Sequence, residues 1–234
     1  MTNKILSFGK VRLTYGQVGV QPTAYRFGTT YETFTYSTYD DALDINEFGG
    51  GFRLNDDQGN STLNPEIKTE FEFGTDLRFF NDRLNVGFTY YKNEIDNIFL
   101  AVNLSPSSGF LSKYSNAGKM QNKGIELDFS YEVLKKKNWL VSVDWNWTRN
   151  RNLVTDLNGS ASILLGGLNG VSSRAVEGYP LGALWGIGFQ KDVKGAYVLN
   201  ANGFPTSEVE QKVLGDPNPD WRSGLGLNVE YKNF

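Results

Sequence analysis

The sequence predicts an all-β protein built from long antiparallel hairpins. Residues 69–93 and 125–148 both alternate apolar and polar side chains at every second position, which is typical of β-strands with two unlike faces. The polar faces carry charge and glycine in mid-strand, as in a barrel wall with lipid on one side and a wet interior on the other. We therefore expect an antiparallel transmembrane β-barrel segment, a partial barrel that forms a meander of long hairpins with large extracellular loops.

Composition agrees with this fold class and excludes several others. Mean hydropathy is −0.40, and no run approaches the roughly 18 apolar residues that a membrane helix needs. The net charge of −3 argues against nucleic acid as a partner. The chain has neither cysteine nor histidine, which removes thiol and imidazole catalysis and the usual zinc ligands. We expect no enzyme, no metal site and no cofactor.

The first strand is expected at residues 7–16, where apolar and polar residues alternate from Lys10 to Tyr15. Residues 17–66 then form a long irregular stretch, which is ordinary for an extracellular loop of a barrel. Its aromatic residues either stack on sugar rings or simply pack the loop. The candidate substrate contacts are Tyr25, Tyr31, Tyr36 and Tyr39.

The hairpin at residues 69–93 has a short polar turn at residues 80–83. Its apolar face begins at Phe71 and its polar face at Glu70. The polar side chains expected to face the barrel lumen from its first strand are Glu70, Glu72, Asp76 and Arg78. Its second strand is expected to end near Ile98, and a second long loop follows at residues 99–123.

A second hairpin, at residues 125–148, repeats the first around a turn at residues 134–138. Its expected lumen-facing residues are Glu126, Asp128 and Asp144. Aromatic residues near strand ends suit the two interface girdles of a barrel, where a ring lies half in lipid. One girdle is expected to contain Phe79, Tyr131 and Trp139, and the other Tyr90 and Trp147.

Residues 153–220 carry a weaker pattern. Residues 174–190 are expected to form a Gly-rich strand onto which residues 191–200 pair back, and the capping-box pattern Ser207-Glu208-Val209-Glu210 predicts a short helix that ends at Gly215. A last strand is expected at residues 223–231. Because the short turns lie on one side of the membrane, residues 153–220 cross it an even number of times. The simplest number is zero, so we expect a large outer loop with its own small hairpin.

Several short motifs resemble the SusC/RagA family of TonB-linked outer-membrane proteins. Each motif is short, but their order and spacing are together fairly specific, and they extend from Val11 to Phe234. They are Val11-Arg12-Leu13-Thr14-Tyr15-Gly16, Leu63-Asn64-Pro65-Glu66, Phe80-Asn81-Asp82-Arg83-Leu84, Tyr90-Tyr91-Lys92, Asn116-Ala117-Gly118, Asn122-Lys123-Gly124-Ile125-Glu126-Leu127, Glu177-Gly178-Tyr179-Pro180-Leu181-Gly182, Pro219-Asp220-Trp221-Arg222-Ser223-Gly224-Leu225 and Tyr231-Lys232-Asn233-Phe234.

The resemblance implies a large barrel with a plug domain, in the cell outer membrane of a Gram-negative, Bacteroidetes-like bacterium. Such proteins import oligosaccharides or peptides, contact outer-membrane lipid, are driven by the TonB complex through the plug, and assemble with a SusD-like surface lipoprotein. About five strands do not close a barrel of the 22-strand transporter size. We therefore expect residues 1–234 to be part of the barrel domain of such a receptor, with signal peptide, plug and closing strands absent.

Two other hypotheses remain open on sequence alone. A secreted soluble β-sandwich that binds glycans also has alternating strands and loop aromatics, but it buries its apolar faces instead of presenting them to lipid. A glycoside hydrolase that runs on two carboxylates, Glu126 or Asp128 among them, is the third hypothesis.

Overall fold

The computed structural model describes residues 5–34, 37–38, 41–42, 51–168 and 170–232, and this part of the chain is almost entirely β-structure. Its one helical element is a 3-10 turn at Pro106–Ser108. Of the candidate tyrosines, Tyr36 and Tyr39 lie outside the described residues. Among the described residues, helices of the length and apolar character needed to cross a membrane are lacking. The predicted all-β class is confirmed.

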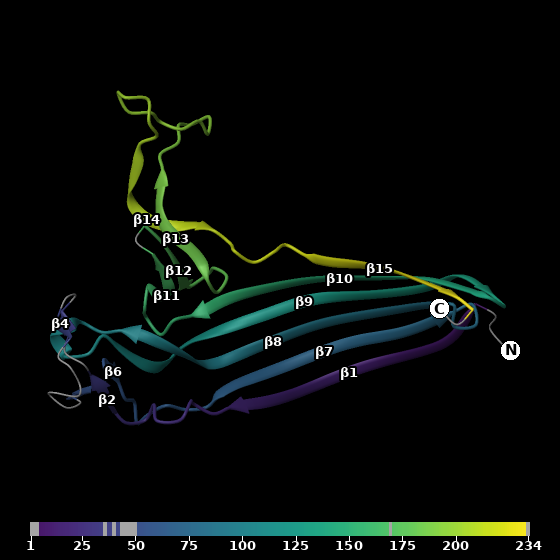
Figure 1. Ribbon diagram of the computed structural model, residues 1–234, viewed down its shortest axis with the longest axis horizontal. Helices are drawn as coiled ribbons and strands as arrows, with labels where there is room; N and C mark the ends of the chain where they lie inside the picture. The colour runs from purple at the N-terminus through teal and green to yellow at the C-terminus, as the bar shows by residue number, and fades with distance from the viewer. Residues whose placement is uncertain (1–4, 35–36, 39–40, 43–50, 169, 233–234) are drawn as a thin grey trace.

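A long twisted sheet dominates the structure (Figure 1). Its strand order is β1-β7-β8-β9-β10-β15, and each neighbouring pair along this path is antiparallel. The strands are β1 (Leu6–Val20), β7 (Glu66–Phe79), β8 (Leu84–Asn103), β9 (Ser112–Lys136), β10 (Trp139–Asp156) and β15 (Arg222–Tyr231). The predicted meander of long hairpins is therefore correct.

Short turns and both described chain ends gather at one end of this sheet (Figure 1). The β7–β8 turn has positive φ angles at Phe80, Asn81 and Asp82, which allow the chain to reverse within four residues. The β9–β10 turn is tighter than predicted, because β9 continues to Lys136 and only residues 137–138 connect the two strands.

The predicted loop at residues 99–123 is wrong. β8 continues to Asn103 and β9 already begins at Ser112, so the connection is only residues 104–111. β8 has a bulge between Ile95 and Ile98, with Asn97 at φ 61°. The bulge shifts the alternation of side chains by an odd number of residues, so the apolar–polar pattern no longer indicates that the strand continues. The Asn116 side-chain amide donates to the Asn97 carbonyl at 2.9 Å and holds the bulge.

A second sheet rises from the far end of β10 (Figure 1). Its strands, in spatial order, are β11 (Ser162–Leu168), β12 (Val171–Val176), β13 (Ala183–Phe189) and β14 (Ser207–Gly215). The predicted strand at residues 174–190 is thus two strands, and β13 pairs with β14 instead of with residues 191–200. The predicted helix at residues 207–215 is wrong, because this segment is β14.

The long connection between β1 and β7 is a loop, as predicted, with small two-stranded pieces. These are β2 (Tyr31–Phe34) with β5 (Gly51–Leu54), and β3 (Ser37–Thr38) with β4 (Asp41–Ala42), while β6 (Asp57–Gln58) runs parallel to the start of β9. Arg26 ties this loop to β9, because its guanidinium pairs with Asp57 at 3.1 Å and stacks 4.0 Å from the Tyr114 ring centre.

The buried core is small and lies where the second sheet meets the extended ends of the long strands. It contains Ala117, Val154, Leu157, Ile163 and Ala175. The apolar face of the main sheet is left open: Leu13 is 69% exposed and Leu225 is 77% exposed. Among the described residues, no second sheet packs across that face, which is what a soluble β-sandwich requires.

Candidate functional site

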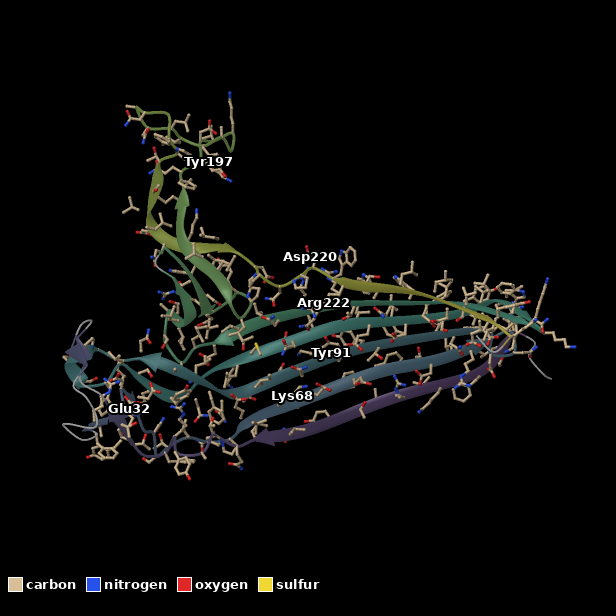
Figure 2. The ribbon with its side chains drawn as sticks, viewed as in Figure 1. Glu32, Lys68, Tyr91, Tyr197, Asp220 and Arg222 are labelled. Carbon is tan, nitrogen blue, oxygen red and sulfur yellow. The ribbon has the colours of Figure 1, made fainter. Side chains whose placement is uncertain are left out.

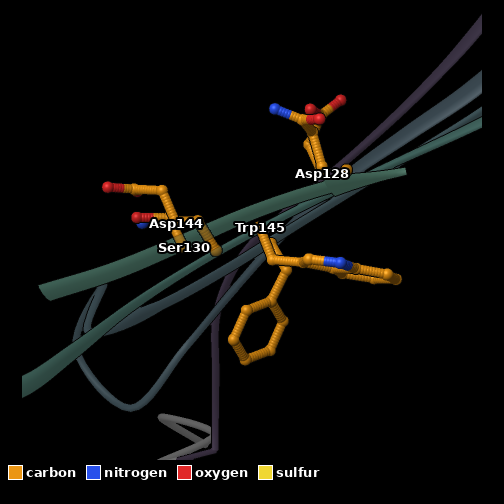
Figure 3. Close-up of a pocket in the computed structure, with 8 residues that line it drawn as sticks. Asp128, Ser130, Asp144 and Trp145 are labelled. Carbon is orange, nitrogen blue, oxygen red and sulfur yellow. The ribbon is translucent and has the colours of Figure 1, made fainter. Parts of the chain in front are cut away.

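The strand register sorts the side chains of the main sheet onto two unlike faces. In the close-up of Figure 3, Asp128, Ser130 and Asp144 project from one side of the ribbon and Trp145 projects from the other. Asp128 is paired with Gly87 and Asn146 on the neighbouring strands, so one polar row crosses three strands. All seven residues expected to face the lumen share this polar face: Glu70, Glu72, Asp76, Arg78, Glu126, Asp128 and Asp144.

Ion pairs and hydrogen bonds link side chains across the polar face. Arg12 of β1 forms an ion pair with Asp76 of β7, and its second terminal nitrogen lies 3.5 Å from the Thr89 hydroxyl of β8. Gly74 makes room for this guanidinium, since a Cβ at that position would lie 2.7 Å from Arg12 Nη2. Arg78 stacks on Phe8 at 5.0 Å from the ring centre.

A second network lies nearer the loops. The Tyr91 hydroxyl donates to Asn150 Oδ1 at 3.1 Å, reaching across the strand between them. Gly124 is the residue it crosses, and a Cβ there would meet the Tyr91 ring and hydroxyl at 2.4 Å. Asn93 donates to Glu70 at 3.2 Å, and Lys68 contacts the same carboxylate at 2.5 Å. Figure 2 places Lys68 and Tyr91 on this part of the sheet.

The sequence pointed to the carboxylates of the polar face but not to the side chains that organise it. Arg12, Tyr91 and Asn150 were not among the predicted site residues. Glycine provides the signal that identifies them: on a face of large polar residues, a strand glycine marks the place where a neighbour's side chain lies across the backbone. Gly74 and Gly124 both have this role.

The opposite face is apolar and aromatic from the short turns to the middle of the sheet. One row contains Phe79, Leu84, Tyr131 and Val143, and the next contains Leu77, Val86, Phe129 and Trp145. Trp139 lies nearest the short turns, where its ring lies 4.5 Å from that of Tyr231. Tyr90 and Trp147 lie in two adjacent rows, closer to the long loops. This spacing fits the predicted pair of girdles, whose contact with lipid stays a prediction.

Beyond Tyr90 and Trp147 the same face becomes charged. Lys92, Lys123 and Arg151 are direct cross-strand partners, and Arg149 lies one row below. Glu94 accepts hydrogen bonds from Lys92 and Gln121, which lower the pKa of its carboxyl. Lys119 bonds Asp96 at 2.9 Å, and this contact raises the pKa of the lysine.

The candidate substrate-contact tyrosines do not form a described cluster. Tyr25 has φ 66° and is 84% exposed, and Tyr31 at the start of β2 is 73% exposed. Their role as substrate contacts stays a prediction.

The motifs singled out in the sequence meet one another at the loop end of the sheet. Asn116 binds both the amide and the carbonyl of Asn64 at 2.8 Å, which joins two motifs that are 52 residues apart. The amide of Gly178 and the carbonyl of Tyr179 pair with Val154 at 2.9 Å, so a third motif covers the upper edge of β10. Asp220, labelled in Figure 2, belongs to a fourth motif and forms an ion pair with Arg151. These motifs fix how the long connections dock on the strands.

Long antiparallel strands with one polar, internally paired face and one open apolar face define the wall of an outer-membrane-type β-barrel. The chain belongs to the TonB dependent receptor-like, beta-barrel family, whose profile matches residues 5–233. This match confirms the resemblance to SusC/RagA proteins, and so does a relative named SusC. This is a barrel family of the outer membrane, and the β-sandwich alternative is not favoured.

Named relatives agree with this assignment. The chain is 24% identical over 202 residues to TonB-dependent receptor P3 of Formosa agariphila, covering 76% of this chain and 20% of the relative. It is 25% identical over 191 residues to TonB-dependent receptor SusC of Bacteroides thetaiotaomicron, covering 75% of this chain and 19% of the relative. The chain therefore spans about a fifth of the length of the curated relatives it matches.

Solved structures show the same fold. The structure of the RagAB peptide transporter superposes with a TM-score of 0.73 at 23% identity, covering 98% of this chain and 26% of that chain. The RagAB peptide importer in its open-open state gives a TM-score of 0.71.

Proposed function

We propose that this chain forms part of the wall and outer loops of a TonB-dependent importer of the SusC type. The observation that carries the proposal is the pairing of a hydrogen-bonded polar face with an open apolar face on the same long strands. Sheet edges are not tolerated in lipid, so β1 and β15 would join further strands of the same receptor. Residues 1–234 would then be one part of its barrel domain.

In the intact receptor, the polar face would line the lumen that holds the plug. Energy for import would come from the TonB complex acting through that plug. The outer loops would meet an oligosaccharide or a peptide and a SusD-like lipoprotein, and no residue of this chain would carry out covalent chemistry. The carboxylates Asp76 and Glu70 support a structural role, because each already bonds a neighbouring cation.

The proposal is tested by the alternation of lipid access along β10. The chain has no cysteine, so single cysteines carrying a nitroxide can be placed at Ser142, Val143, Asp144 and Trp145 in an otherwise cysteine-free intact receptor. In lipid vesicles, positions 143 and 145 should be accessible to oxygen, and positions 142 and 144 to a water-soluble nickel reagent. A uniform response along the strand, or an apolar face closed to oxygen, contradicts the barrel assignment.

Substrate class needs a separate test. Uptake of labelled oligosaccharides and of labelled peptides is compared in cells with and without the receptor gene. The class that is imported should depend on the gene and stop when TonB is deleted. Uptake that persists without TonB rules out the proposed energy source.

A further inference from the structure

We propose that the outward cations Lys92, Lys123, Arg149 and Arg151 form a binding surface for the phosphate of a lipid headgroup. The surface, named here the cation row, lies on the membrane face of the sheet, on the side of the long loops. The inference rests on the proposed barrel function and adds a partner to it, a phosphate-bearing lipid of the leaflet on that side.

The first argument is the direct alignment of like charges. Lys123 is the cross-strand partner of Lys92 on β8 and of Arg151 on β10. Side chains directly opposite on neighbouring strands lie close together, and like charges there are destabilising. Three cations in one row therefore favour an anion between or above them.

The second argument is that the carboxylates nearby compensate only part of this charge. Glu94 pairs with Lys92 at 3.0 Å and Asp220 pairs with Arg151. Within the described part of the chain, Lys123 and Arg149 form no ion pair, and both side chains are exposed. Four cations thus face two carboxylates. The two cations without an ion pair lie diagonally adjacent, because Arg149 is opposite Ile125 and Lys123 is two residues from Ile125 on the same strand.

The third argument is depth. The row below Lys92, Lys123 and Arg151 contains Phe73, Tyr90 and Ile125 together with Arg149, and the next row contains Phe88, Leu127 and Trp147. A strand that rises about 3.3 Å per residue at a tilt of about 40° gains roughly 5 Å of height in two residues. A headgroup layer is about 5–7 Å thick. Lys92, Lys123 and Arg151, two residues beyond Tyr90 and Ile125, therefore lie at headgroup depth, and Arg149 lies at its inner edge.

Among the described residues, the short-turn end of the sheet has no set of three outward cations in direct cross-strand register. Its outward positions on β1, β7 and β8 are Leu6, Phe79 and Leu84. On β9 and β10 the outward residues there are Lys136 and Trp139, which are paired with each other. Outward cations that are aligned on neighbouring strands are thus found, among the described residues, on one side of the apolar band, which matches a single leaflet.

The test uses the intact receptor in detergent and bisphosphorylated lipid A as the probe. Binding is measured by native mass spectrometry for the wild type and for K123Q/R149Q, which removes only the two cations without an ion pair. Each cation near an anionic surface contributes about fivefold to binding, so the double variant should bind about 25-fold more weakly. The conservative variant K123R/R149K should bind like the wild type.

The matched control is K136Q/K137Q, which removes two positive charges at the short-turn end. It should leave binding unchanged. Equal loss in the control, unchanged binding in K123Q/R149Q, or equal binding of dephosphorylated lipid A each overturns the proposal. Displacement of the lipid by inorganic phosphate at equal concentration overturns it as well, because the site would then recognise a free anion. If K123Q/R149Q does not fold, K123Q alone is used, with an expected loss of about fivefold.

Failure of this proposal is distinguishable from failure of the barrel assignment. Alternating lipid access along β10 with no selectivity for the phosphorylated lipid rules out the cation row alone. Loss of the alternation rules out the barrel assignment and the cation row with it.

Discussion

At the scale of single residues, glycines on the polar face determine which side chains can reach one another. Tyr91 and Asn150 are on strands separated by β9, and their bond at 3.1 Å exists only because Gly124 leaves the space between them empty. Gly74 on β7 does the same for Arg12 of β1 and Thr89 of β8, whose side chains lie 3.5 Å apart. The glycines therefore extend hydrogen bonding from adjacent strands to strands two apart, which stiffens a sheet whose buried core is small.

Gly124→Ala is expected to destabilise the intact receptor by about 1–3 kcal/mol, because the new methyl group overpacks the Tyr91 ring. The measurement is thermal unfolding in detergent, together with loss of the Tyr91–Asn150 hydrogen bond in the structure of the variant. Gly16→Ala is the matched control, since no atom lies within 4 Å of the position that a methyl group on this strand glycine would take. An equal effect of the two substitutions contradicts the explanation.

Asn116 shows how a short sequence motif acquires its structural role. Its side chain bonds Asn64 twice at 2.8 Å and Asn97 once at 2.9 Å. The next two residues are buried: Ala117 is in the core, and a Cβ on Gly118 would lie 2.7 Å from the Asp156 carbonyl. Each residue of the motif thus serves a different contact, and none of these contacts is visible without the partner strands.

At the scale of elements, alternation predicted the strands wherever it was unbroken. The hairpins at residues 69–93 and 125–148 and the last strand follow from period-2 patterns on two faces. The predicted ends were too short, because β8 and β9 continue past a bulge that shifts the pattern. A search for period 2 stops at such a bulge although the pairing continues.

The error at residues 207–215 has a different cause. Ser207-Glu208-Val209-Glu210 satisfies the capping-box pattern, but the same residues alternate Glu208, Glu210 and Lys212 with Val209, Gln211 and Val213. Pairing of β14 with β13 decides between the two, with Trp185 opposite Val213 and Phe189 opposite Ser207. Local capping preference is weak compared with tertiary pairing of the strand.

The faces of the candidate site were predictable for the same reason as the strands. The alternation of side chains along each strand is enough to assign Glu70, Asp128 and Asp144 to the polar face. Which polar residues touch one another requires the register, and register depends on the bulge between Val141 and Ser142 and on the tight turn before Trp139. The cation row was missed because its residues come from three strands and are adjacent only in the assembled sheet.

The two faces predict opposite responses to an introduced charge. Val86→Arg places a charge in the middle row of the apolar face, beside Leu77 and Phe129, and should cost about 2–4 kcal/mol if that face is in lipid. The measurement is the yield of folded receptor in the outer-membrane fraction. Asn85→Arg, one residue away on the polar face, should assemble at close to the wild-type level. Equal yields for the two variants contradict a lipid-facing β8.

At the scale of the whole molecule, the structure separates a regular wall from an irregular outer part. The main sheet supplies long antiparallel strands with one polar and one apolar face, while the second sheet and its tip project from its far end (Figure 1). The tip, residues 191–205, is held by bridges between Lys191 and Tyr197 and between Leu199 and Pro205. It exposes large apolar side chains, with Val193 fully exposed and Phe204 67% exposed.

Exposed apolar side chains on a projecting hairpin favour contact with another protein. In the proposed receptor we expect this partner to be the SusD-like lipoprotein. The strand pairing at the base of the tip allows the tip to be removed cleanly. Gln190 N bonds Thr206 O at 2.9 Å, so residues 191–205 can be replaced by an Asn-Gly turn between two residues that are already paired. β13 and β14 keep their register in this variant.

Tip replacement is expected to weaken association with the lipoprotein about tenfold or more, the effect of losing one well-packed apolar anchor, while the barrel still assembles. The measurement is co-purification of the lipoprotein with the intact receptor, alongside the yield of receptor in the outer membrane. The matched control replaces residues 105–110 by the same turn between Leu104 and Leu111, which are also bonded at 2.9 Å. Unchanged co-purification, or an equal loss in both variants, removes the tip as the contact.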